Sequence, residues 1–185
     1  MSQSDLFSFF VDSGINPNDA LQVFTFDDDY SFGILQSDIH WRWFVERCST
    51  LKGDFRYTSN TVYDSFPWPQ SPTLDQARAV AKAAVRVREE RARLMTEHGY
   101  TLRDLYRTIE LPGENSLKRV HNELDVAVRR AYQMSARANV LEFLFTLNQR
   151  LAEAEAAMAV ITPPGLPPSV KNKREFISKD CIRSR

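Results

Sequence analysis

The sequence predicts an α+β N-terminal piece, followed by a mainly α-helical bundle and then an extended basic tail. Fifteen of the 21 aromatic residues precede Gln70, whereas alanine, arginine, leucine and glutamate dominate the residues that follow. Four prolines lie within residues 163–168, and six basic residues lie within the last fifteen. These shifts in composition predict three segments: residues 1–70, 71–161 and 162–185.

The first segment contains two stretches that predict strands. Leu21–Phe26 alternates and is rich in strand-forming residues, and Tyr30–Leu35 has the composition of a second strand. The acidic run Asp27–Asp29 separates them, so the pair predicts a hairpin, although the turn has no Asn-Gly signal. Ser37 is a favourable N-cap for a helix of about three turns that ends near Cys48.

The second segment has strong helix-boundary signals. Thr73 and Gln76 form a capping box for a long helix that ends near the C-cap glycine Gly99. Thr101 and Asp104 repeat the capping pattern over a short helix. Two further amphipathic helices are expected at 116–134 and 137–160. Short connections between amphipathic helices predict an antiparallel bundle of three or four.

The composition excludes several classes of function. The 24 basic and 24 acidic residues cancel, so no global field requires a polyanionic partner. No two of the six glycines are closer than 14 residues, which excludes a dinucleotide-binding fingerprint, a P-loop and a nucleophile elbow. The three histidines lack the spacing of a zinc site, and no Glu-x-Lys pair occurs. We therefore predict no catalytic, cofactor-binding or metal-ligating residue in this chain.

Cysteine usage and hydropathy predict where the protein resides. Cys48 and Cys181 are 133 residues apart and form no Cys-x-x-Cys pair, which fits a reducing compartment. The sequence contains no run of about 18 apolar residues, so it predicts no membrane span. The first residues lack the pattern of a secretory signal. These features predict a cytoplasmic protein with no membrane partner.

Basic residues recur along the long helix expected after Thr73. Arg78, Lys82 and Arg86 are four residues apart and share one side, where they could follow a phosphate backbone. The other members of this predicted basic face are Arg88, Arg91 and Arg93. The favoured alternative is a solvated face, because glutamates are interspersed among these cations.

A second polar cluster lies inside the aromatic segment and consists of Arg56, Tyr57, Thr58, Ser59 and Asn60. Arginine and asparagine can read base edges, and hydroxyl groups can bind phosphates. By residue type alone an ordinary polar loop is the favoured interpretation.

The other residues that could bind bases or take part in catalysis are expected to have structural roles. Trp41, Trp43 and Trp68 are expected in the core rather than stacked on bases. His40 is expected to be an ordinary helix histidine, because no neighbouring nucleophile or orienting group is evident. Asn16–Asp19 is expected to form an Asx-type turn rather than a base-holding motif.

Two stretches resemble a known family. They are residues 27–37, with the sequence Asp-Asp-Asp-Tyr-Ser-Phe-Gly-Ile-Leu-Gln-Ser, and residues 55–70, with the long irregular string Phe-Arg-Tyr-Thr-Ser-Asn-Thr-Val-Tyr-Asp-Ser-Phe-Pro-Trp-Pro-Gln. Both resemble the C-terminal region of the MmeI-like DNA methyltransferases, single-chain restriction–modification enzymes that modify adenine at N6. The similarity continues through the helical segment and the proline-rich stretch.

This resemblance implies a domain assignment. Residues 1–70 would be the last part of a target-recognition domain, and residues 71–185 the C-terminal part. The methyltransferase domain, which binds S-adenosylmethionine in that family, would lie outside the chain, because the glycine-bearing cofactor motif and Asn-Pro-Pro-aromatic are missing. The chain would then be a fragment, a broken remnant or the recognition half of a split enzyme.

The expected function is therefore target recognition for an adenine-specific DNA methyltransferase, without catalysis by this chain. The expected partners are double-stranded DNA and the missing methyltransferase domain, in cis or in trans. The resemblance makes DNA contact, or docking on the catalytic domain, as plausible as a structural role for Arg56, Tyr57, Ser59 and Asn60. The alternatives are a non-catalytic helical protein-interaction module and a non-functional gene remnant.

Overall fold

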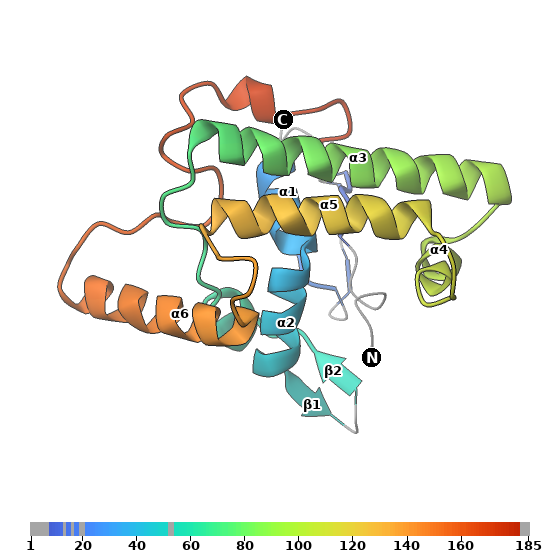
Figure 1. The fold of residues 1–185 in the computed structure, drawn as a ribbon. Coiled ribbons are helices and arrows are strands. Elements are labelled where there is room, and N and C mark those ends of the chain that lie inside the picture. Colours follow the sequence, from blue (N-terminus) through green and yellow to red (C-terminus); the bar gives the residue numbers. More distant parts are fainter. Residues whose placement is uncertain (1–7, 13, 16, 19–20, 52–53, 182–185) are drawn as a thin grey trace.

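The computed structural model describes residues 8–12, 14–15, 17–18, 21–51 and 54–181. Figure 1 shows their arrangement. Asn16 and Asp19 of the predicted Asx turn lie outside the described residues. The described elements are α1 (Asp29–Gln36), α2 (Asp38–Arg47), β1 (Ser49–Leu51), β2 (Asp54–Arg56), the π-helix η2 (Ser59–Tyr63), α3 (Leu74–His98), α4 (Leu102–Thr108), α5 (Ser116–Ala131), α6 (Val140–Ala156) and the 3₁₀-helix η3 (Lys173–Phe176).

Helices α3 and α5 lie side by side at the centre, and α1 packs against both (Figure 1). A glycine permits the close approach of α1: a Cβ at Gly33 would lie 2.8 Å from Val80 Cγ1 and 3.3 Å from Leu124 Cδ1. All eight residues of α1 are buried. The resulting core is one cluster, to which the first 70 residues and the later helices both contribute.

The hairpin predicted at residues 21–35 is wrong. Residues 30–35 belong to helix α1, because Asp28 caps its N-terminus and accepts a 2.7 Å hydrogen bond from the Ser31 amide. A helix buried on every side has no solvent-facing side, so its sequence lacks the amphipathic helical period, and its polar residues Asp29, Ser31 and Gln36 are buried with the others. Residues 21–26 form no strand either, and Phe24 packs at the edge of the core on Tyr63.

The described sheet structure is the short antiparallel hairpin β1–β2, which follows α2 and pairs Ser49 with Arg56. The chain is therefore mostly helical, and its β content does not lie where the sequence predicted it. Helix α2 begins after Ser37 as expected, with the Ser37 hydroxyl as acceptor for the His40 amide.

The predicted helix boundaries of the second segment are largely confirmed. Both capping boxes are present, one at Thr73 and one at Thr101, and Gly99 ends α3 in the left-handed conformation with φ of 67°. Helices α5 and α6 are shorter than expected, since α5 ends at Ala131 and α6 starts only after its N-cap Asn139.

The C-terminal tail is not simply extended. Thr162 joins Gln70 through a 2.9 Å backbone-to-side-chain hydrogen bond, and the chain then returns along α3 (Figure 1). There it forms η3 and buries the Phe176 ring completely in the core. The tail thus folds as part of the molecule, because it supplies one of the largest fully buried side chains.

Candidate nucleic-acid interface

The hairpin β1–β2 presents Arg56 to solvent at one end of the molecule (Figure 1). Side chains alternate between the two faces of a strand. Phe55 is half-buried, with its ring centroid 6.2 Å from that of Phe44, so Arg56 belongs to the opposite face. Among the described residues, the Arg56 side chain is exposed and has no hydrogen-bond or ion-pair partner.

Tyr57 anchors the end of this strand. Its ring stacks on Phe44 with centroids 5.3 Å apart, and its hydroxyl lies 3.0 Å from His40 Nε2. His40 Nδ1 lies 2.8 Å from the Leu35 carbonyl oxygen, which can only accept, so Nδ1 donates. In the neutral ring Nε2 then accepts from Tyr57. Burial lowers the pKa of His40 to about 4 and raises the pKa of Tyr57 above its ordinary range, which keeps both groups neutral.

Ser59 and Asn60 open the π-helix that follows and are both exposed. The Ser59 hydroxyl donates to Gln22 Oε1 over 3.1 Å. The Asn60 amide has no side-chain partner among the described residues. The residues of the predicted cluster therefore lie next to one another. Arg56 and Asn60 are the members whose side-chain polar groups have no partner among the described residues.

Helix α3, which carries the predicted basic face, lies beyond α2 and α1 from the hairpin β1–β2 (Figure 1), so the structure does not bring the two candidate sites together. Arg78 bonds Glu175 over 2.8 Å, and Arg86 forms an ion pair with Glu123. Lys82 between them is exposed and has no partner in the described part of the chain.

Two members of the predicted basic face are not solvated. Arg91 is 4% exposed and donates over 2.8 Å to the Ser8 carbonyl and also to the Tyr106 hydroxyl. The helical spacing indicates this burial, because residue 91 lies four positions after Val87 and seven after Ala84, on the apolar side of the helix.

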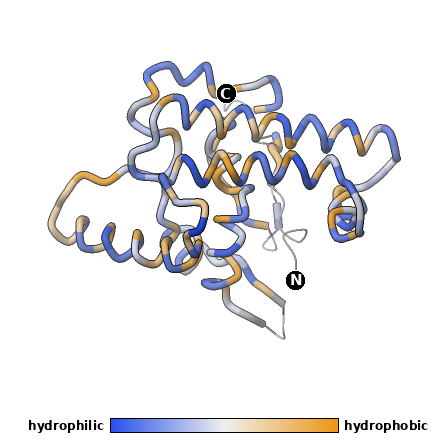
Figure 2. The backbone as a smooth tube through the Cα atoms, viewed as in Figure 1, coloured by the Kyte–Doolittle hydropathy of each residue, from blue (hydrophilic) through white to orange (hydrophobic). Residues whose placement is uncertain are grey.

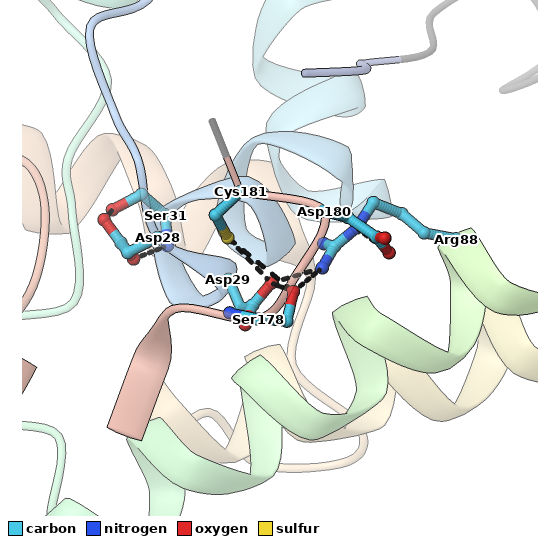
Figure 3. A network of polar contacts seen from close by, with 7 residues as sticks. All are labelled: Asp28, Asp29, Ser31, Arg88, Ser178, Asp180 and Cys181. Carbon is cyan, nitrogen blue, oxygen red and sulfur yellow. Dashed lines mark hydrogen bonds and ion pairs between the residues drawn. The ribbon is translucent and has the colours of Figure 1, made fainter. Parts of the chain in front are cut away.

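Arg88 is the second residue of the predicted basic face that is not solvated, and Figure 3 shows its contacts. Its guanidinium forms a buried ion pair with Asp29 and lies 4.6 Å from the centroid of the Phe32 ring. Asp29 also accepts from the Ser178 amide over 3.0 Å and from Cys181 Sγ over 3.3 Å. This network ties α1, α3 and the tail together. Sequence patterns could not reveal it, because its members are up to 152 positions apart.

Other classes of site find no support in the described part of the chain. No group of three or more metal-ligating side chains occurs among those residues. No helix in the same residues is long and apolar enough to cross a membrane. Trp41, Trp43 and Trp68 are buried, as expected for packing residues.

Comparison with known proteins decides the family. The model of the MmeI target recognition domain matches residues 7–70, and the model of the MmeI C-terminal domain matches residues 73–155. The chain belongs to the MmeI family. The resemblance noted in the sequence is thereby confirmed. Both matched segments contribute to one core, so the predicted domain boundary at residue 70 stays a prediction.

Two individual relatives agree with this assignment. The chain is 34% identical over 127 residues to DNA methyltransferase A of Bacillus subtilis (strain 168), covering 67% of this chain and 14% of that protein. It also resembles the Type IIL restriction-modification enzyme MmeI, solved in complex with DNA, with a TM-score of 0.59 and 28% identity over 68% of this chain and 16% of that enzyme. The chain thus spans about one-seventh of the length of the curated DNA methyltransferase that it matches.

Proposed function

We propose that this chain is the DNA-recognition and C-terminal part of a site-specific adenine-N6 DNA methyltransferase of a restriction–modification system. It binds double-stranded DNA and performs no methyl transfer. The methyltransferase domain and its S-adenosylmethionine lie outside the chain, in cis or in trans. The two free cysteines, Cys48 and Cys181, support a cytoplasmic location.

The geometry of Arg56 is the observation that carries the recognition role. Its guanidinium is solvated, unpaired in the described structure and mounted on a two-stranded ribbon, an element that fits the major groove. Tyr57 fixes the backbone beside it through Phe44 and His40. Arginine in such a position can donate two hydrogen bonds to the O6 and N7 atoms of guanine. Asn60, also exposed, is the second candidate for a base edge.

The direct test is selection from a randomised duplex library by the chain and by its Arg56→Ala variant. We expect the chain to enrich a defined site and the variant to lose preference at one position, with a cost of about 1–3 kcal/mol for that base pair. Arg107→Ala is the matched control, because Arg107 is also exposed but lies on α4. An unchanged preference in Arg56→Ala would remove this residue from the recognition surface.

A protein-interaction role is the second candidate, and the segment after α6 favours it. Met158 is 95% exposed and Val160 is fully exposed, and Figure 2 shows this apolar loop at the margin of the molecule. Exposed apolar groups of this kind mark docking surfaces. A purely protein-binding module would associate independently of salt and bind no duplex, whereas DNA affinity falls steeply with salt.

A further inference from the structure

The tail and helix α3 form one continuous structure. Glu175 bonds Arg78 near the start of α3, and Ser178 bonds Arg88 over 2.9 Å about three turns further along. Phe176 lies between these contacts and is completely buried. The anchor around Asp29 (Figure 3) therefore holds the tail in a fixed position beside the helix.

This folding brings the tail, which carries four exposed cations, alongside the helix that carries Lys82, more than 85 positions earlier in the sequence. We call these five residues the α3–tail surface: Lys82, Lys171, Lys173, Arg174 and Lys179. All five are exposed, and none has a side-chain hydrogen bond or ion pair within the described part of the chain.

The acidic residues beside this surface do not cancel it. Glu175 and Asp180 face arginines, with Glu175 on Arg78 and Asp180 Oδ2 3.8 Å from Arg88 Nε. Asp75 lies within 3.4 Å of Arg78 as well. Arg78 and Arg88 offset only two of the four carboxylates that they contact, and Glu89 of α3 is also exposed. The five unpaired cations still outnumber the three remaining carboxylates, so the surface keeps a net positive charge that can attract an external anion.

We propose that the α3–tail surface binds the phosphate backbone of double-stranded DNA without reading its sequence. This inference rests on the proposed function and adds a second contact, remote from the hairpin. The flexible ammonium groups of lysine can bind phosphates. Phosphate contacts position a protein on the duplex but carry no sequence information.

The apolar side chains near the surface argue against other anionic partners. Phe176 is buried and Ile177 is half-buried, so neither ring stacking on single-stranded bases nor insertion into a lipid surface has a side chain available there.

The test compares Lys82→Gln/Lys173→Gln/Arg174→Gln with a control of equal charge, Arg103→Gln/Arg107→Gln/Lys118→Gln. All six positions are exposed, and the control residues lie on α4 and the first turn of α5, at the far end of the molecule (Figure 1). The affinity of the full chain for a short duplex of random sequence is measured between about 50 and 200 mM salt. Circular dichroism melting verifies that both variants fold.

We expect the first variant to bind every duplex more weakly and to flatten the slope of log affinity against log salt by about 3, one unit for each lost phosphate contact. The control should keep the original slope. If the chain binds duplex and both variants behave like it, the α3–tail surface is not a DNA contact, while the proposed function stands. If the unaltered chain binds no duplex, both proposals fail. Tighter binding to single-stranded RNA of the same length would also overturn the assignment to duplex DNA.

Discussion

His40 illustrates how burial fixes the chemistry of a single side chain. It is 1% exposed, its Nδ1 donates to the Leu35 carbonyl, and its Nε2 accepts from the Tyr57 hydroxyl. Each nitrogen of the neutral ring thus has a hydrogen-bond partner, whereas a protonated ring would place a positive charge in a site buried away from water, and this burial lowers the pKa of His40. His40 therefore positions the strand that carries Arg56 and does not act as a general base.

This burial predicts a pH-dependent stability. The folded pKa of His40 is about 4, below the ordinary value of 6.5, so the unfolded chain binds more protons between these values. Stability from His40 is present above pH 6.5 and is lost as the pH falls toward 4, by about 1.4 kcal/mol per pH unit. Urea unfolding of the chain and of His40→Asn at several pH values should show a smaller slope in the variant. Equal slopes would contradict the neutral buried state. His98→Gln is the control, because His98 is exposed.

At the scale of elements, the tail depends on one buried carboxylate. Asp29 joins the tail at Ser178 and Cys181 to Arg88 of α3. Removing one partner of a buried pair leaves the other charge uncompensated, which costs more than the pair contributes.

We therefore expect Asp29→Asn to lower the free energy of unfolding by about 3–5 kcal/mol. Hydrogen exchange at the amides of 176–181 should accelerate in the same variant. Asp180→Asn is the matched control: Asp180 also approaches Arg88, but its side chain is 39% exposed, so its loss should cost less than about 1 kcal/mol. Slow exchange of the tail in Asp29→Asn would contradict this dependence, and would show that Phe176 and the contacts of Glu175 and Ser178 with α3 hold the tail without Asp29.

Elements defined by local signals were predictable, and elements defined by long-range packing were not. The capping boxes at Thr73 and Thr101 involve residues three apart, so their helices follow directly from the sequence. The sequence predicts a strand where helix α1 lies, since complete burial leaves α1 without the solvent-facing side that marks an amphipathic helix. The resemblance of residues 55–70 to the family indicates Arg56 as a candidate DNA contact. The exposure of Arg56 to solvent depends on how Phe55 packs on Phe44, which the sequence does not show.

At the scale of the whole molecule, the two family segments fold together. Helix α1 lies in the matched segment 7–70, yet it packs through Gly33 against Val80 and Leu124 of the segment 73–155. The tail adds Phe176 to the same core. We therefore expect the described residues to unfold as one cooperative unit.

The distribution of chromophores makes this testable. All three tryptophans lie before residue 70, whereas most helical residues lie between 74 and 156. Tryptophan fluorescence and far-ultraviolet circular dichroism should therefore report the same urea midpoint. Two separate midpoints would show that residues 1–70 and the helices are independent domains, and would favour the division predicted from composition.

The central claim about the whole molecule is that this chain determines which DNA site is recognised. A chimera tests this claim most directly. The region of Bacillus subtilis DNA methyltransferase A that aligns with this chain is 14% of that protein, so this chain can replace it while the remainder is kept. Methylated positions in host DNA are then mapped for the chimera, for the unaltered relative and for a chimera carrying Arg56→Ala. We predict methylation at a new site in the first chimera and relaxed selection at that site in the Arg56→Ala chimera. A folded, active chimera that still methylates the relative's original site would contradict the account, because recognition would then lie outside this chain.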